Sequence, residues 1–220
     1  MDRRFYYEFL YPLQDDVLEI LSRVDTKLYL TGGTAASRGY LQHRFSDDLD
    51  LFANDAPEFG LWAGRVVEAL SSSDRWRVEV LLREERFVRA NLVQEKGSMK
   101  IELVNDVPAH VGQLSDHPVL GRLDSPENIL ANKITAVIDR SEPKDLADVW
   151  GFCSKMGMSV EDALTNAHSK ASGLFAADVA RVLLSATEND WKLIRWIDAP
   201  RVEVFLADLQ RIGEALLLIE

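Results

Sequence analysis

The sequence contains a single cysteine, Cys153, in 220 residues, so no disulfide can form within the chain. One isolated thiol suits a reducing compartment. The sequence also lacks an apolar run of about 20 residues, which a membrane-spanning helix needs, and its first residues lack the apolar segment of a secretory signal. These absences predict a cytoplasmic protein with no membrane partner.

Basic residues are also scarce. Lys and Arg number 25 against 36 Asp and Glu, which gives a formal net charge of −11. Because an acidic surface repels phosphate backbones, any RNA site must be a local basic patch. The candidates are Arg38 with Arg44, and the group of Arg83, Arg86 and Arg89, although a solvated surface charge is the simpler interpretation of each.

The sequence does contain enough apolar residues, 47% of the chain, to build a sizeable core. Apolar periodicity predicts helices and alternation predicts strands. Strands are expected over residues 28–31, 49–52, 76–82, 87–93 and 99–104, and helices over residues 5–24 and 57–71. A loop that contains Pro and Gly follows over residues 105–123. Further helices are expected from Ser125 onward and over residues 143–156, 159–170, 173–187 and 200–218. We therefore predict an α+β fold with a mixed sheet, in which residues 1–110 form an α/β core and residues 111–220 a mainly helical C-terminal subdomain.

Two aspartates lie in the second expected strand. Since strand residues alternate between faces, Asp48 and Asp50 share one side while Leu49 and Leu51 face the core. Their Cα atoms are expected about 6.5–7 Å apart, so that both carboxylates can bind Mg²⁺ or Mn²⁺. The alternative is a pair of solvent-facing acids on an edge strand. Asp47 is a further acid beside the pair, which a surface position would explain.

A glycine pair follows the first expected strand. Gly32 and Gly33 can adopt positive φ and leave their N–H groups open to an anion. The helix that follows would add its positive end, and Thr34 or Ser37 could offer a hydroxyl to a phosphate. An ordinary capped helix start is the alternative. Together with the two aspartates, the pair favours a nucleotide-binding site.

These residues resemble a known family, the AbiEii/AbiGii-type nucleotidyltransferase toxins of the polymerase-beta-like nucleotidyltransferase superfamily. The resemblance covers about residues 28 to 150 and rests on Gly32-Gly33-Thr34-Ala35, Tyr40, His43-Arg44, Ser46 and Asp48-Leu49-Asp50-Leu51-Phe52. It implies a polymerase-beta-like core with a helical C-terminal subdomain. It also implies growth inhibition by nucleotide addition, with a nucleoside triphosphate as donor, a tRNA 3′ end as acceptor and a separately encoded antitoxin as partner.

A third carboxylate comes from a later strand. In residues 99–104, alternation sends Lys100, Glu102 and Val104 to one face and Ile101 and Leu103 to the other. Glu102 is therefore the candidate that completes a metal site and helps to activate an acceptor hydroxyl. A glutamate on an exposed strand is the alternative interpretation.

The helical part supplies a lysine and two acids. Lys133 lies on an apolar helix stripe, so its ammonium either reaches water or contacts a nucleotide phosphate, which the resemblance favours. Asp145 and Asp148 lie one helical turn apart in a segment that looks like the family's Asp-x-x-Asp motif, and could anchor Lys133 or lie near the metal. A helix-dipole role is the alternative, and Asp148 is the preferred functional residue. We interpret His43 as a hydrogen-bonding residue rather than a base.

The sequence thus predicts a Mg²⁺-dependent nucleotidyltransferase. Asp48, Asp50 and Glu102 would bind the metal, and Gly32, Gly33, Thr34, Ser37 and Lys133 the nucleotide. Lys133 would also offset charge as pyrophosphate leaves, and Asp148 is the further catalytic candidate, as an anchor for Lys133 or a residue near the metal. Two alternatives stay open. The acceptor could be a protein side chain or a small molecule, or the chain could be a noncatalytic module that binds a nucleotide or a partner.

Overall fold

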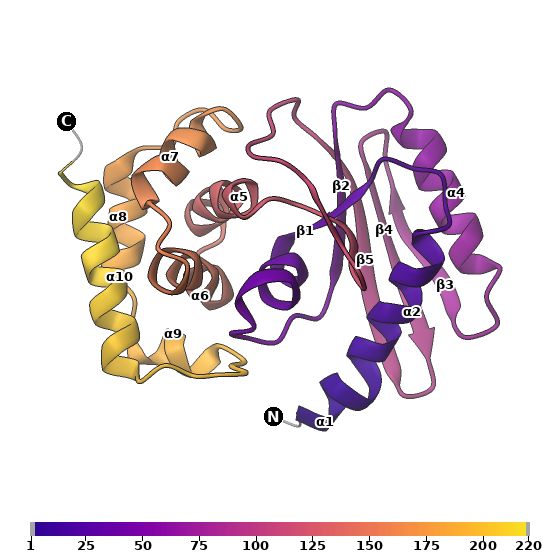
Figure 1. The fold of residues 1–220 in the computed structure, drawn as a ribbon, viewed down its shortest axis with the longest axis horizontal. Helices are drawn as coiled ribbons and strands as arrows, with labels where there is room; N and C mark the ends of the chain where they lie inside the picture. Colours follow the sequence, from indigo (N-terminus) through magenta and orange to yellow (C-terminus); the bar gives the residue numbers. More distant parts are fainter. Residues whose placement is uncertain (1–2, 219–220) are drawn as a thin grey trace. The chain divides into compact units, whose positions relative to one another are not determined.

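The computed structural model describes residues 3–218, which form two compact units (Figure 1). The first unit contains the chain up to Ala35, Ser46–Pro108 and Gln113–Asp124. The second contains Ala36–Phe45, Ala109–Gly112 and the chain from Ser125 onward. The predicted division between residues 110 and 111 stays a prediction. Two segments cross it, because residues 113–124 pair with the sheet and residues 36–45 bond to the helices.

A mixed sheet of seven strands forms the centre of the first unit, with the order β3-β4-β5-β2-β1-β7-β6. Strand pairs β2–β5 and β1–β7 are parallel and the other neighbours are antiparallel. The strands are β1 (Tyr29–Thr31), β2 (Leu49–Asn54), β3 (Arg77–Arg83), β4 (Phe87–Gln94), β5 (Gly97–Asp106), β6 (Ser115–His117) and β7 (Gly121–Leu123). The predicted fold class is confirmed. The β6–β7 hairpin was missed because each of its strands has only three residues.

Two helices cover the apolar face of this sheet. The N-terminal helix is continuous through α1 (Arg3–Phe5), the π-helical η1 (Tyr6–Leu10) and α2 (Tyr11–Leu21), and α4 (Phe59–Ser71) packs against α2. Helix α4 buries residues 59, 62, 63, 66 and 70, the spacing of one helical face. In β2, Leu49 and Leu51 are buried while Asp50 is half-buried, so the predicted alternation is confirmed.

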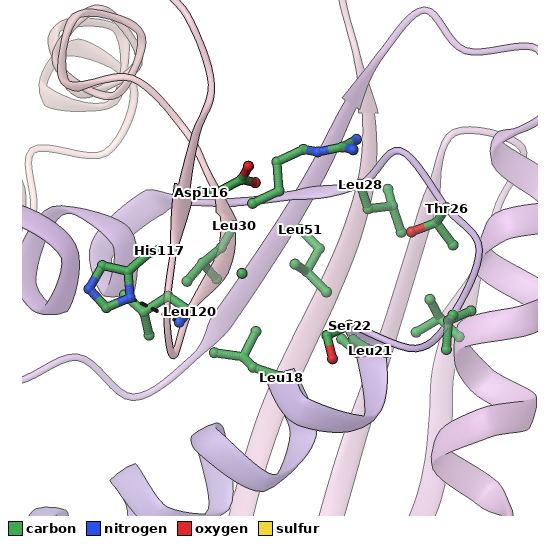
Figure 2. A pocket seen from close by; sticks show the side chains of 14 residues that line it. Leu18, Leu21, Ser22, Thr26, Leu28, Leu30, Leu51, Asp116, His117 and Leu120 are labelled. Atoms are coloured by element: carbon green, nitrogen blue, oxygen red, sulfur yellow. Dashed lines mark hydrogen bonds between the residues drawn. The ribbon is translucent and has the colours of Figure 1, made fainter.

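A cavity of about 310 Å³ lies in the first unit between these layers. Figure 2 shows Leu18 of α2, Leu30 of β1 and Leu51 of β2 around it, with His117 from the β6–β7 hairpin at its edge. Because Leu51 and Asp50 are neighbours in one strand, they point to opposite faces of the sheet. The cavity and the carboxylate of Asp50 are therefore on opposite sides.

The second unit is helical. It contains the π-helical η2 (Ala35–Leu41), apart from the first residue of η2, which belongs to the first unit. Its other helices are α5 (Pro126–Asp139), α6 (Pro143–Trp150), η3 (Gly151–Lys155), α7 (Val160–His168), α8 (Ala176–Leu184), α9 (Glu188–Leu193) and α10 (Val202–Leu216). Helix α5 begins as predicted, since the Ser125 hydroxyl accepts a hydrogen bond from the Asn128 N–H and Pro126 opens the first turn. The additional short helix α9 has a capping box between Thr187 and Asp190.

The tryptophans of this unit pack together. The Trp196 ring lies 5.7 Å from Trp150 and 5.5 Å from Phe205, centroid to centroid, in edge-to-face geometry. These rings stabilise the junction of α6 and α10 with the segment after α9. Within residues 3–218, none of the helices has both the length and the apolar character needed to span a membrane.

The alternation in the sheet gives a stability prediction. Leu92 of β4 is fully buried, whereas Leu81 of β3 is 55% exposed. We expect Leu92→Ala to lower the free energy of unfolding by about 2–5 kcal/mol, because it removes buried methyl groups and leaves a cavity, and Leu81→Ala to lower it by less than about 1 kcal/mol. Urea unfolding followed by circular dichroism measures both, and equal losses would contradict the burial pattern.

Candidate functional site

Asp50 and Gly32 lie against each other on the polar side of the sheet. Thr31 of β1 pairs with Asp50 of β2, and Gly32 then opens the helical segment α3 (Gly32–Thr34) with φ of +66°. A Cβ at residue 32 would lie closer to Oδ2 of Asp50 than non-bonded atoms approach. Glycine is therefore required twice, for the backbone angle and for the space that the carboxylate fills. Of the two glycines that were expected to be able to adopt positive φ, Gly32 does so and Gly33 does not.

The two candidate hydroxyls bond to the protein itself. Thr34 is buried, donates to the backbone carbonyl of Asp48, and has its Oγ1 3.1 Å from Oγ of Ser46. Ser37 is also buried and donates to the carbonyl of Arg44. Thr34 thus fixes the chain just before β2, and Ser37 closes the turn that follows η2.

Residues that sequence reasoning missed hold the same segment. The Gln14 amide, fully buried in α2, donates to the carbonyls of Ser46 and Asp47, 3.2 Å from each. The Tyr6 hydroxyl donates to Oδ1 of Asp47 at 2.7 Å. Asp47 therefore takes part in anchoring the approach to β2. A glutamine on an otherwise apolar helix face was the available signal for Gln14.

Glu102 stands beside Asp50. The parallel register of β2 and β5 pairs these two residues directly, so they share one face of the sheet. Oε1 of Glu102 accepts hydrogen bonds from Nε of Arg89 at 2.7 Å and from Nζ of Lys100 at 3.1 Å. Lys100 Nζ also lies 3.1 Å from Oδ2 of Asp48. One ammonium thus bridges two of the three predicted metal-binding carboxylates.

These contacts keep the groups charged. Burial opposes ionisation of Glu102, but Lys100 and Arg89 hold the pKa of its carboxyl below the usual value. Burial likewise opposes protonation of Lys100, but Asp48 and Glu102 raise the pKa of its ammonium. At neutral pH Glu102 and Lys100 are therefore both charged, and Glu102 is a weak proton acceptor.

The donor set suits a hard cation, since carboxylate oxygens are the ligands of Mg²⁺ and Mn²⁺. Among residues 3–218, no three His, Cys, Asp or Glu side chains are grouped so that they could hold a metal ion. The reason is local, because Asp48 and Glu102 converge on the Lys100 ammonium. The carboxylates offer the oxygen ligands that such a cation prefers, and in this arrangement the Lys100 ammonium occupies the space between two of them.

A second set of charges lies in the helical unit. We call His43, Arg44, Lys133, Asp145 and Asp148 the buried ionic cluster; each is at most 5% exposed. The carboxylate of Asp148 accepts two hydrogen bonds from the Arg44 guanidinium, both 2.7 Å, and one from Nε2 of His43 at 2.9 Å. The sequence analysis anticipated part of this cluster, because one interpretation of Asp145 and Asp148 was that they anchor Lys133.

Lys133 joins the two aspartates of the cluster. Its Nζ lies 2.7 Å from Oδ2 of Asp148 and 2.9 Å from Oδ1 of Asp145. Arg140 binds the other side of Asp145 through Nε at 2.7 Å and Nη2 at 2.8 Å. Lys133 therefore bonds to two carboxylates, and its stem follows the apolar stripe as predicted.

The cluster depends on complete charge pairing. Burial opposes ionisation of Asp148, but Arg44 and Lys133 hold the pKa of its carboxyl well below the usual range. Burial lowers the pKa of His43 despite its bond to Asp148. Among the described residues Nδ1 of His43 has no hydrogen-bond partner. We infer a neutral imidazole that donates its Nε2–H to Asp148.

Removing the central acid of the cluster should destabilise the fold. We expect Asp148→Asn to lower the free energy of unfolding by about 3–5 kcal/mol at pH 7, because it leaves buried cations without a counter-charge. Asp198→Asn, at an aspartate whose side chain is 80% exposed, serves as control and should change little. Denaturant unfolding of both variants measures the difference.

The lowered pKa of Asp148 also determines how the stability lost in Asp148→Asn depends on pH. A depressed pKa stabilises the fold above the unfolded-state pKa, and the contribution disappears as pH falls through the folded-state value. The difference in free energy of unfolding between wild type and Asp148→Asn should therefore stay constant from about pH 5 to 8 and become smaller below about pH 4. A gap that widens in acid would contradict the assignment.

His43 gives a separate pH prediction. Because its pKa is lowered on folding, the unfolded chain takes up a proton first, and stability should fall as pH drops below about 6.5. His43→Gln removes this titration, so its unfolding free energy should depend less on pH between 7.5 and 5.5. Parallel unfolding curves at several pH values test the slope, and an equal slope in both proteins would refute a buried neutral His43.

Comparisons with known proteins agree with this geometry. A family described as nucleotidyl transferase AbiEii toxin of a type IV toxin–antitoxin system matches residues 16–196. The fold is similar to that of JHP933 from Helicobacter pylori, with 18% identity and a TM-score of 0.65 over 98% of this chain and 93% of that one. It is also similar to MenT4, a nucleotidyltransferase toxin from Mycobacterium tuberculosis, with 17% identity and a TM-score of 0.66 over 96% and 84% of the two chains. A search of curated proteins gives no match.

The family match covers most of the chain, including the carboxylates on the sheet and the buried ionic cluster. This protein therefore belongs to the AbiEii nucleotidyltransferase toxin family of type IV toxin–antitoxin systems.

Proposed function

We propose that this protein transfers a nucleoside monophosphate from a nucleoside triphosphate to an acceptor hydroxyl, with a tRNA 3′ end as the acceptor and Mg²⁺ or Mn²⁺ as the cofactor. The observation that carries the proposal is the placement of Asp50, whose carboxylate fills the space left by Gly32 and stands next to Glu102. An acid pair beside a glycine-opened helix start would bring metal ligands and phosphate-binding N–H groups to one place.

In the proposed reaction, the acceptor hydroxyl gives up its proton to water, and its oxygen forms a bond to the α-phosphorus of the triphosphate. The bond from that phosphorus to the bridging oxygen breaks, and pyrophosphate leaves with the electron pair. A bound divalent ion would neutralise the phosphate charge and lower the pKa of the attacking hydroxyl. Asp48, Asp50 and Glu102 would hold that ion, while Gly32 and Gly33 would offer N–H groups to the triphosphate.

The remaining residues receive positioning roles. Thr34 is bonded to the backbone of Asp48 and would keep that acid in place. Because Glu102 accepts two cationic donors, it serves in this proposal as a ligand rather than as the base. Lys133 and Asp148 are nearly fully buried and paired with each other, so we propose that they order the helical unit, and Ser37 the turn after η2.

The proposal also includes an acceptor for the nucleotide and an antitoxin partner. Family membership favours a nucleotide substrate and a cognate antitoxin. The net charge of −11 favours an acceptor held at a limited basic surface, such as an RNA end, over a long nucleic-acid duplex. The same charge gives some support to a protein or small-molecule acceptor, which the assay below distinguishes by its labelled product.

The first experiment follows label from each α-labelled nucleoside triphosphate into total tRNA in the presence of Mg²⁺. We expect Asp50→Asn to lower the rate by about a thousandfold, or about 4 kcal/mol of transition-state stabilisation, with little change in thermal unfolding. EDTA should abolish transfer by the wild type. Asp25→Asn, at an aspartate whose side chain is 98% exposed, is the matched control and should retain full activity.

Two results would overturn the proposal. Undiminished transfer by Asp50→Asn would remove the metal assignment. Absence of label on RNA, with label on added protein or a small-molecule hydroxyl, would retain the chemistry and replace the acceptor.

A further inference from the structure

Lys100 occupies a defined position between two acids. It lies on β5, two residues before Glu102 and on the same face. The register of β2 with β5 pairs Leu49 with Ile101, which brings the preceding residues, Asp48 and Lys100, side by side. The ammonium ends 3.1 Å from one oxygen of each acid.

The position of this ammonium conflicts with that of a metal ion. A divalent cation placed between Asp48 and Glu102 would lie where the Lys100 ammonium now lies, and two cations cannot share that space without strong repulsion. Arg89 is placed differently. It reaches Glu102 alone, through Nε, and its side chain is 42% exposed. Lys100 is therefore the cation that a metal ion has to replace.

The pair is also open enough for exchange. The side chains of Lys100 and Asp48 are 34% and 35% exposed, so neither is locked in the interior. A lysine has a flexible stem and a compact charge, and it can leave one partner for another at small cost. The oxygens of a triphosphate are acceptors that would receive the released ammonium.

We propose that Lys100 is an internal counter-ion that holds Asp48 and Glu102 in place and blocks free divalent ions, so that metal enters together with a nucleoside triphosphate. This inference rests on the proposed function, because it takes these acids as metal ligands. In it, Lys100 is a positioning residue that moves from the carboxylates to the phosphates when the metal arrives.

The test measures binding of Mn²⁺ alone by electron paramagnetic resonance, with the full chain and no nucleotide. We expect Lys100→Met to bind Mn²⁺ about tenfold or more tightly than wild type, which corresponds to at least about 1.4 kcal/mol. Lys100→Arg keeps the charge and should bind as weakly as wild type. Lys96→Met removes an exposed lysine from the turn before the same strand and should also match wild type.

A second measurement adds a nonhydrolysable nucleoside triphosphate. Wild type should then gain Mn²⁺ affinity strongly, while Lys100→Met, which has already lost the competing ammonium, should gain less. Adding Asp50→Asn to Lys100→Met should remove the tight Mn²⁺ binding. Circular dichroism establishes that each variant is folded.

The outcomes separate the two ideas. If Lys100→Met binds free Mn²⁺ no more tightly than wild type, while both bind it with nucleotide in a manner that needs Asp50, the counter-ion role is refuted and the metal site stands. If no variant binds Mn²⁺ with or without nucleotide, the metal assignment itself fails, and the inference fails with it.

Discussion

Charge compensation of carboxylates at the surface and in the interior is the constraint on which both units depend. A carboxylate removed from water loses its hydration, and only close cations or N–H donors restore the balance. Asp148 meets this requirement with Arg44, Lys133 and His43, and Glu102 meets it with Arg89 and Lys100. The set around Asp148 links segments that are distant in sequence, since Arg44 and Asp148 are 104 residues apart. Lys100 links Glu102 to Asp48, which precedes another strand.

The two sets differ in access to solvent, and that difference separates their roles. The side chains of Asp148 and Asp145 have no exposed area, and Lys133, which joins them, is only 6% exposed. Asp48 and Lys100 are about one third exposed. An ion pair that water reaches is weak, and its members are available to a ligand. The buried ionic cluster thus suits a fixed framework, while the carboxylates on the sheet suit exchange of one cation for another.

Sequence patterns predicted the parts of this arrangement that depend on local periodicity. Alternation in β2 and β5 placed Asp50 and Glu102 on the face of the strands opposite the buried leucines, and the glycine turn located the start of α3. The pairing of the strands was not available, because register depends on contacts between residues about 50 positions apart. Lys100 was on the predicted face, but its bridge to Asp48 follows only from that register. Gln14 was hidden for the same reason, since its acceptors lie 32 and 33 residues away.

Several arginines that the sequence offered for phosphate binding are already paired within the protein. Arg44, considered as part of an RNA-binding patch, is only 3% exposed and bonds to Asp148, so that interpretation of Arg44 is wrong. Arg86 bonds to Asp55 and to the carbonyls of Asn105 and Asp106, and Arg89 bonds to Glu102. These cations are already neutralised by the protein. A metal ion that took over Asp48 and Glu102 would free the charge of Lys100 at the place where phosphates have to bind. The freed ammonium would add positive charge where the phosphates of the substrate bind, in a chain whose net charge is −11.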